Sequence, residues 1–240
     1  MAKQDNFYLE TESNAFFDRW WEAQNQTAPE GLREKKKGIF EMVSKLGDVN
    51  EKRVLEIGCF IGDLLNYFRQ EHQCEVHGVE SSSKACNFAK TQFGLEIENA
   101  TLAQSTLFNL DDATKDRFDI IICEDVLSWV SRDLIIPCLG VIDWMLKPGG
   151  RLFIRDFSPS FGFAYENHHC AGQEIYNFKQ PGGHRSFFLQ SGKYLEALSS
   201  IRTDCKFQGI ETSRPDSMTW ADSVLIKLEG NLHPVLSLNE

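Results

Sequence analysis

The sequence lacks any C-x-x-C pair, although its 240 residues include seven cysteines. These cysteines are scattered and odd in number, which argues against a disulfide framework and against a zinc site built on paired thiolates. We therefore expect reduced, mostly buried cysteines and a cytoplasmic location. The cysteines are Cys59, Cys74, Cys86, Cys123, Cys138, Cys170 and Cys205.

Long apolar runs and an excess of basic charge are also missing. No apolar run approaches the roughly 20 residues of a membrane-spanning helix, and the opening MAKQDNFYLE has no apolar stretch typical of a secretory signal. The 25 Lys and Arg residues are outnumbered by 35 Asp and Glu residues, which gives a formal net charge of −10. We therefore expect no nucleic-acid partner and no membrane partner.

What the sequence does contain is a short apolar run followed at once by a glycine turn, in RVLEIGCFIG. The run at 53–57 predicts a buried parallel strand, and the helical spacing that begins at Asp63 predicts a helix to about Glu71. A strand, a glycine turn and a helix together bring a ligand against bare backbone at a helix N-terminus. This loop is therefore the first candidate binding site.

The glycine pattern departs from that of a dinucleotide-binding loop, G-x-G-x-x-G, because Phe60 stands where a middle glycine would be. The outer glycines and an acidic residue at the end of the strand are present. The candidate ligand-binding residues of this loop are Glu56, Gly58, Cys59, Phe60 and Gly62.

A second acidic residue ends the next predicted strand, at 74–80. Glu80 follows Gly62 by roughly the 20 positions at which a carboxylate accepts hydrogen bonds from both hydroxyls of a ribose. This position does not exclude NAD, which presents the same diol. Ser81 and the serines after it cap a helix that ends at Gly94.

The following segments resemble the later motifs of the class I S-adenosylmethionine-dependent methyltransferases. A short strand at 95–99 is followed by Thr101 and Leu102. The buried strand FDIIIC leads into EDVLSWV, and a helix at 132–146 ends in LKPGG before the next strand. With the acid and outer glycines of the first loop, these motifs carry the resemblance over about residues 50–156.

The resemblance implies an α/β fold with a doubly wound, seven-stranded, mostly parallel sheet of Rossmann-like type and an antiparallel last strand. N-terminal helices and an insertion after strand five complete it. The implied methyl donor is S-adenosylmethionine, and the product is S-adenosylhomocysteine. By the same resemblance, Glu80 holds the ribose, Thr101 and Leu102 flank the adenine, and Ser81 is a further cofactor-binding candidate. Glu124, Asp125 and Val126 pass the methionine part and face the acceptor.

We expect residues 1–47 to form a helical cap and residues 48–240 to form the methyltransferase domain, with an acceptor-side insertion at 158–188. The aromatic run in SNAFFDRWW predicts either a helix stapled onto the domain or a lid over the acceptor pocket. A helix is predicted over 31–47, where the basic cluster REKKKG forms a solvated face or positions a phosphate-bearing acceptor. After the insertion we expect a helix at 190–201 and strands at 204–210 and 222–228.

Methyl transfer from a sulfonium to a hydroxyl needs in-line alignment and a base that removes the hydroxyl proton. His168 and His169, in the insertion, and Asp156, at the end of strand five, are the candidate catalytic residues. These groups could also bind a divalent metal, but no compact ligand spacing supports this, so we predict no metal.

The leading hypothesis is a methyltransferase that acts on a small molecule, at a hydroxyl of a sugar or polar metabolite. A diffuse likeness to bacterial methyltransferases of surface-polysaccharide and sugar pathways favours it. The alternatives are methylation of an amine or protein side chain, an NAD(P)-dependent oxidoreductase, and a non-catalytic partner subunit. A homodimer is left open.

Overall fold

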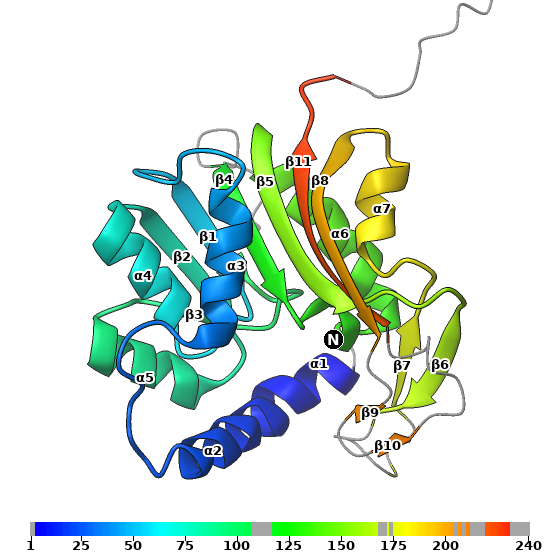
Figure 1. Ribbon diagram of the computed structural model, residues 1–240. Helices are drawn as coiled ribbons and strands as arrows, with labels where there is room; N and C mark the ends of the chain where they lie inside the picture. The colour runs from blue at the N-terminus through cyan, green and yellow to red at the C-terminus, as the bar shows by residue number, and fades with distance from the viewer. Residues whose placement is uncertain are drawn as a thin grey trace, which may run out of the picture.

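The computed structural model describes residues 3–106, 117–167, 172, 175–203, 206–207, 210–211 and 219–230. Its centre is a seven-stranded sheet in the order β3-β2-β1-β4-β5-β11-β8 (Figure 1). The strands of this sheet are β1 (Arg53–Ile57), β2 (Glu75–Glu80), β3 (Glu98–Asn99), β4 (Phe118–Glu124), β5 (Leu146–Phe157), β8 (Tyr194–Thr203) and β11 (Thr219–Lys227).

The sheet is mostly parallel. The pairs β1–β2, β1–β4, β2–β3 and β4–β5 are parallel. The last strand, β11, runs antiparallel to both of its neighbours, β5 and β8. This topology confirms the predicted Rossmann-like fold, including the antiparallel last strand.

Helices cover both faces of the sheet, because successive residues of each buried strand point to opposite faces. On one face, helices α3 (Glu34–Ser44), α4 (Asp63–His72) and α5 (Ser83–Phe93) pack in a core cluster with Val54, Ile120 and Phe153. On the other face, α6 (Arg132–Met145) and α7 (Arg185–Gln190) pack in a cluster with Leu55 and Ile154.

Local signals set the helix ends as the sequence predicts. The Ser82 hydroxyl accepts a hydrogen bond from the Ala85 backbone N–H at 3.1 Å, which caps α5. Gly94 ends this helix in the left-handed conformation, at φ 63°. The cap fixes the loop after β2, where the ligand-binding residues are expected.

The N-terminal segment forms a helical rod of α1 (Lys3–Phe7), a π-helical turn η1 (Tyr8–Glu12) and α2 (Ser13–Ala23). In Figure 1 the rod lies across the lower end of the sheet, beneath the carboxyl ends of the parallel strands. Within the insertion, β6 (Phe163–Glu166) and β7 (Tyr176–Lys179) form a separate antiparallel hairpin.

The helix predicted at 190–201 is wrong. Helix α7 ends at Gln190, Gly192 turns the chain at φ 71°, and β8 then pairs with β11 over its full length. Local helix propensity is overridden here because the edge of the sheet offers a ladder of backbone hydrogen bonds.

The strand predicted at 204–210 does not join the main sheet in the described residues. Residues 206–207 (β9) instead pair with 210–211 (β10) in a separate ribbon, and the other positions of 204–210 lie outside the described residues. The strand predicted at 222–228 corresponds to β11 and is confirmed.

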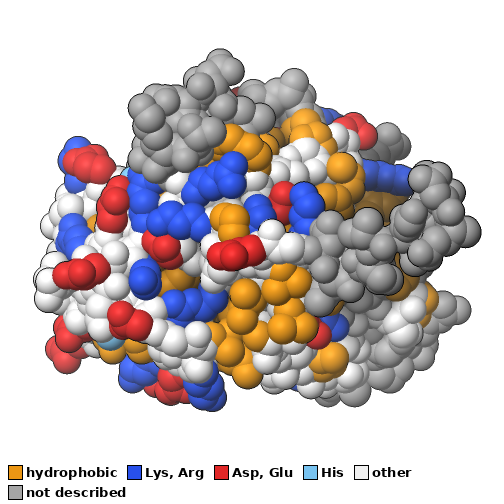
Figure 2. Space-filling model, turned by 90° about the horizontal axis from the view of Figure 1, so that it is seen from above, with side chains coloured by type: hydrophobic (Ala, Val, Ile, Leu, Met, Phe, Trp, Pro, Cys, Tyr) orange, Lys and Arg blue, Asp and Glu red, His pale blue; other side chains and the backbone are white. Residues whose placement is uncertain are grey.

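The described cysteines Cys59, Cys74, Cys86, Cys123 and Cys138 are all free thiols, whereas Cys170 and Cys205 lie outside the described residues. No helix within the described ranges is long and apolar enough to span a bilayer. Figure 2 views the molecule from the end opposite the helical rod, and there basic and acidic side chains are interspersed among the described residues. The described side chains at that end form no broad surface of one charge.

Candidate active site

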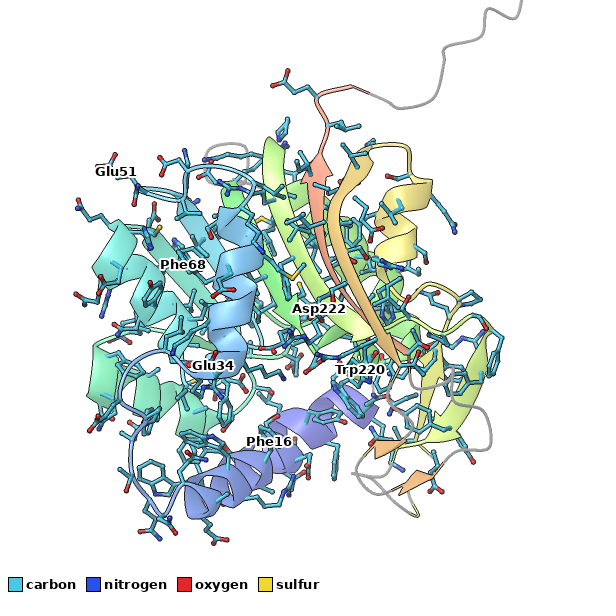
Figure 3. The ribbon with its side chains drawn as sticks, in the orientation of Figure 1. Phe16, Glu34, Glu51, Phe68, Trp220 and Asp222 are labelled. Atoms are coloured by element: carbon cyan, nitrogen blue, oxygen red, sulfur yellow. The ribbon has the colours of Figure 1, made fainter. Side chains whose placement is uncertain are left out.

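A cavity of about 450 Å³ lies at the carboxyl ends of the parallel strands, between the sheet and the N-terminal rod. This is the edge at which open α/β sheets bind ligands. In Figure 3, Trp220 at the lower end of β11 and Phe16 on α2 mark the two elements that face each other across this region. The lining residues are Asp5, Tyr8, Glu12, Ser13, Phe16, Arg33, Lys35, Lys36, Ile57, Gly58, Phe60, Val79, Glu80, Ser81, Ala100, Thr101, Leu102, Glu124, Asp125, Val126, Trp129, Val130 and Trp220.

The loop after β1 forms one wall through bare backbone. Gly58 has φ 70°, and its N–H donates to the Val79 carbonyl at 2.8 Å. A Cβ atom at Gly58 would lie 2.2 Å from Cγ2 of Val126. Glycine is therefore required twice, for the left-handed conformation and for the close approach of the two loops. Phe60 also has positive φ, at 53°, and takes the place of the missing middle glycine.

Glu80 fixes this loop and lines the cavity. One of its carboxylate oxygens accepts from the Phe60 N–H at 2.9 Å, and the other accepts from the Ser82 N–H at 2.7 Å. Burial raises the pKa of Glu80, and these two N–H groups oppose the rise. The Ser81 hydroxyl also donates to the oxygen that Ser82 contacts, at 3.4 Å, so the oxygen beside Phe60 is the one with a lone pair left for a ligand hydroxyl.

The structure brings most of the predicted binding residues to one cavity. Gly58, Phe60, Glu80, Ser81, Thr101, Leu102, Glu124, Asp125 and Val126 all line it. Glu56, Cys59 and Gly62 do not. Cys59 is buried, and Gly62 begins α4 with φ 74°. These two residues belong to the glycine loop but do not face the cavity.

Glu56 is fully buried and forms an ion pair with Lys36. Its Oε1 lies 2.5 Å from Nζ of Lys36, which also lies 2.6 Å from Oε2 of Glu124. Burial raises the pKa of Glu56 to about 7, although Lys36 opposes the rise. Burial would lower the pKa of Lys36, but Glu56 and Glu124 outweigh it and raise that pKa.

The charge network continues along the cavity wall. Glu124 also contacts Lys35 at 2.9 Å and Arg155 at 2.5 Å, and Arg155 pairs with Asp222 at 2.7 Å. Burial opposes ionisation of Glu124, yet Lys36, Lys35 and Arg155 lower its pKa to about 2. The basic cluster of α3 therefore includes one buried lysine that holds two strand ends together.

The N-terminal rod closes the cavity with one helical face. Asp5, Tyr8, Glu12 and Phe16 line the cavity at helical spacing. Asn14 fastens the rod to α5, because its Oδ1 accepts from the Ser82 hydroxyl at 2.9 Å. The aromatic run packs as well, with the Phe17, Trp20 and Trp21 rings against Phe60 or Phe88. The rod is thus both attached to the domain and part of the cavity.

The candidate catalytic residues lie away from the described cavity or outside the described chain. Asp156 is buried and does not line the cavity; it accepts hydrogen bonds from the Ser128 hydroxyl and the Phe157 N–H, and it pairs with His184. Burial would raise its pKa, but His184 and Lys179 hold it at about 2. His168 and His169 lie outside the described residues. Within the described residues, no group of three or more His, Cys, Asp or Glu side chains could hold a metal ion.

Sequence reasoning missed several lining residues. Asp5 and Tyr8 precede the recognisable fold, and Trp220 lies in a strand whose start was misplaced. The helical spacing from Asp5 to Phe16 was the signal that could have revealed the first two. Trp129 was visible in EDVLSWV but was not assigned a role.

The doubly wound sheet, the glycine loop and Glu80 at the second strand end together define a class I S-adenosylmethionine-dependent methyltransferase domain. The sequence pattern of the family described as "Methyltransferase domain" matches residues 31–199, and the chain belongs to this family.

Relatives of several acceptor classes are similar to the chain. A ubiquinone biosynthesis O-methyltransferase of Alkalilimnicola ehrlichii is 29% identical over 58% of this chain and 55% of its own length. A tRNA N(3)-methylcytidine methyltransferase of Schizosaccharomyces pombe is 29% identical over 64% of this chain and 48% of its own. The chain spans about half the length of the curated relatives it matches.

Among solved structures, a 1,6-didemethyltoxoflavin-N1-methyltransferase of Burkholderia thailandensis superposes with a TM-score of 0.59 at 16% identity. The superposition covers 95% of this chain and 92% of the Burkholderia protein. At this identity the likeness shows the fold alone.

Proposed function

We propose that this protein transfers the methyl group of S-adenosylmethionine to a hydroxyl group of a small polar molecule, a sugar or similar metabolite. The observation that carries the proposal is a single cavity that joins two chemically different ends. One end has the glycine loop and Glu80. The other has aromatic and acidic side chains from the N-terminal rod, the η3 turn (Leu127–Trp129) and β11.

The first end fits the donor. Glu80 offers a carboxylate to the ribose diol, and Thr101 and Leu102 offer an edge for the adenine ring. Gly58, with no room for a side chain, admits the ligand close to the backbone. When bound, the sulfonium supplies an activated methyl group, and the residues around it align the donor and acceptor and exclude water.

The second end fits a neutral acceptor. Tyr8, Trp129 and Trp220 supply flat faces on which a ring can stack, and Asp5 supplies a carboxylate that can accept a hydroxyl hydrogen. His168 and His169 remain the proposed bases for removing the hydroxyl proton. Asp156, held by Ser128 and His184, supports the η3 turn in this proposal and does not contact the acceptor.

Methylation of an amine is the second candidate, because the cavity is lined by five carboxylate side chains and three cationic ones. The excess of carboxylates would attract a protonated amine, but the amine must lose its proton before it attacks the methyl group. Replacing His168 and His169 by alanine distinguishes the two candidates: transfer to a hydroxyl falls strongly, whereas transfer to an amine with a low pKa changes little.

The proposal is tested first by thermal unfolding with S-adenosylhomocysteine or NAD. At about a hundredfold excess over its Kd, a ligand stabilises the native state by about 2.7 kcal/mol, which raises Tm by roughly 5–10 °C in a protein of this size. We expect this shift with S-adenosylhomocysteine and none with NAD. A shift with NAD alone would overturn the proposal.

Methyl-labelled donor and metabolite fractions then identify the acceptor by mass. The expected product is a methyl ether. A labelled methylamine as the sole product would replace the hydroxyl proposal with the second candidate.

A further inference from the structure

The acceptor end of the cavity is assembled by three elements that are far apart in sequence. The Gln4 side chain of the rod ties the η3 turn to the hairpin strand β7, because its Nε2 donates to the Trp129 carbonyl at 2.7 Å and to Asn177 Oδ1 at 3.1 Å. The Tyr8 hydroxyl accepts from Asn167 Nδ2 at 2.9 Å, and the Tyr8 and Trp129 rings lie 6.2 Å apart. These contacts give the acceptor end a fixed shape.

Asp5 is a buried carboxylate of this end, and one of its oxygens has no hydrogen-bond donor among the described residues. Its residue is 3% exposed, and its Oδ2 is buried and accepts no hydrogen bond from the described residues. Burial raises the pKa of this carboxyl, and the nearby Ser131 hydroxyl opposes the rise. A buried acceptor without a donor is costly, so a ligand that supplies a donor to Asp5 gains that energy back.

The cations that line the cavity are all bound to carboxylates within the described residues. Arg33 makes two contacts of 2.7 Å with Asp63. Lys35 pairs with Glu124 and Asp125, and Lys36 pairs with Glu56 and Glu124. Each described cation of the lining is thus already paired with a carboxylate.

The described cations of the insertion do not line the cavity. Lys179 is 4% exposed and does not line the cavity; its Nζ lies 3.8 Å from the Phe157 ring centre and 5.5 Å from that of Trp129. Arg185 and His184 do not line the cavity either. A phosphate placed beside the unpaired oxygen of Asp5 would therefore meet like charge, and burying it there would be unfavourable.

We propose that the acceptor is an uncharged ring bearing hydroxyl groups, which stacks against Trp129, Trp220 and Tyr8 and donates a hydrogen bond to Asp5. The site rejects the phosphorylated form of the same molecule. This inference rests on the proposed function, because it names the class of acceptor for that cavity. It favours, for the basic cluster REKKKG, the predicted role of a solvated face over that of positioning a phosphate.

Matched pairs of probes test the proposal by calorimetry on the protein saturated with S-adenosylhomocysteine. One pair is catechol and phenyl phosphate, and the other is methyl glucoside and glucose phosphate. We expect at least one uncharged member to bind and its phosphate to bind at least about tenfold more weakly. The two pairs distinguish a phenolic ring from a sugar ring.

Variants locate the bound probe. Asp5→Asn should weaken the uncharged probe by at least about tenfold, the equivalent of one hydrogen bond to a charged group. Glu10→Gln is the matched control on the same rod, since Glu10 is exposed and does not line the cavity. Trp220→Leu, on β11, gives an independent measure should Asp5→Asn fail to fold, and S-adenosylhomocysteine binding reports the folding of every variant.

The outcomes separate the inference from the proposed function. Failure to bind S-adenosylhomocysteine refutes the proposed function. Where that ligand binds normally, three outcomes refute this inference alone. Each phosphate binds as well as its uncharged partner, no uncharged probe binds, or Asp5→Asn and Trp220→Leu both bind the probe normally.

Discussion

Replacing Lys36 by methionine tests the buried charge network at the cavity wall. Lys36 is 4% exposed and lies between Glu56 at 2.5 Å and Glu124 at 2.6 Å. Without Lys36, Glu124 keeps Lys35 and Arg155, but Glu56 loses the only cation that an ion pair gives it among the described residues. Breaking a buried ion pair in this way costs about 3–5 kcal/mol. We expect a loss of this size in the free energy of unfolding at pH 8.

The loss should depend on pH, because Glu56 can escape its uncompensated charge by binding a proton. Its folded pKa is about 7, above the ordinary value of 4.5. The folded state therefore binds the proton more tightly than the unfolded state, and this stabilisation is fully present below pH 4.5 and is lost as the pH rises through 7. Lys36→Met raises the folded pKa further. The difference from the parent protein should thus be about 1 kcal/mol smaller at pH 6 than at pH 8.

Urea unfolding at both pH values measures these differences. The control is Lys37→Met, one position along α3, where the lysine is exposed and pairs only with Glu34 at 3.0 Å; it should change stability by less than about 0.5 kcal/mol. Adding Glu56→Gln to Lys36→Met removes the unpaired charge and should restore much of the loss. A loss below about 1 kcal/mol at pH 8, or an equal loss at both pH values, would refute the reasoning.

Two further predictions concern the donor end of the cavity. Glu80→Ala should weaken S-adenosylhomocysteine binding by about 1–3 kcal/mol in calorimetry, because the ribose hydroxyls lose a charged acceptor; Glu75→Ala, at the exposed start of the same strand, should leave the affinity unchanged. Gly58→Ala should weaken binding and lower Tm, because the new Cβ would meet Val126 at 2.2 Å. Gly149→Ala separates the clash from backbone strain, since Gly149 has φ 77° with nothing within 4 Å of the added Cβ; equal losses in both variants would contradict the clash.

The parallel part of the fold could be predicted because local signals and tertiary structure agree there. The strand at 53–57, the helix from Asp63 and the strand ending at Glu80 each combine apolar periodicity with a turn or cap. The same agreement placed Gly58 and Glu80 at one edge of the sheet. Residues on consecutive parallel strands meet at that edge whatever the details of the loops.

The C-terminal part could not be predicted because local and tertiary preferences conflict. Tyr194 and Leu198 are four positions apart, which would place them on the same face of a helix. In β8 the register shifts opposite Val224 and Leu225, and the two side chains enter core clusters on opposite faces of the sheet. Pairing with β11 decides between the helix and the strand. The sequence of residues 190–201 alone carries no information about that pairing.

The role of Lys36, by contrast, was recoverable from two anomalies in the sequence. Lys36, Ile39 and Val43 share one helical face, and all three are buried, so the lysine occupies a position of the apolar stripe. Glu56 is the matching anomaly, an acid inside the apolar strand RVLEI. A buried charge requires a partner of opposite charge. Lys36 and Glu56 could therefore have been predicted to form an ion pair. The acidic residue of the first motif therefore binds α3 to the sheet beneath the cavity, and Glu80 is left as the carboxylate of these two strand ends that lines the cavity.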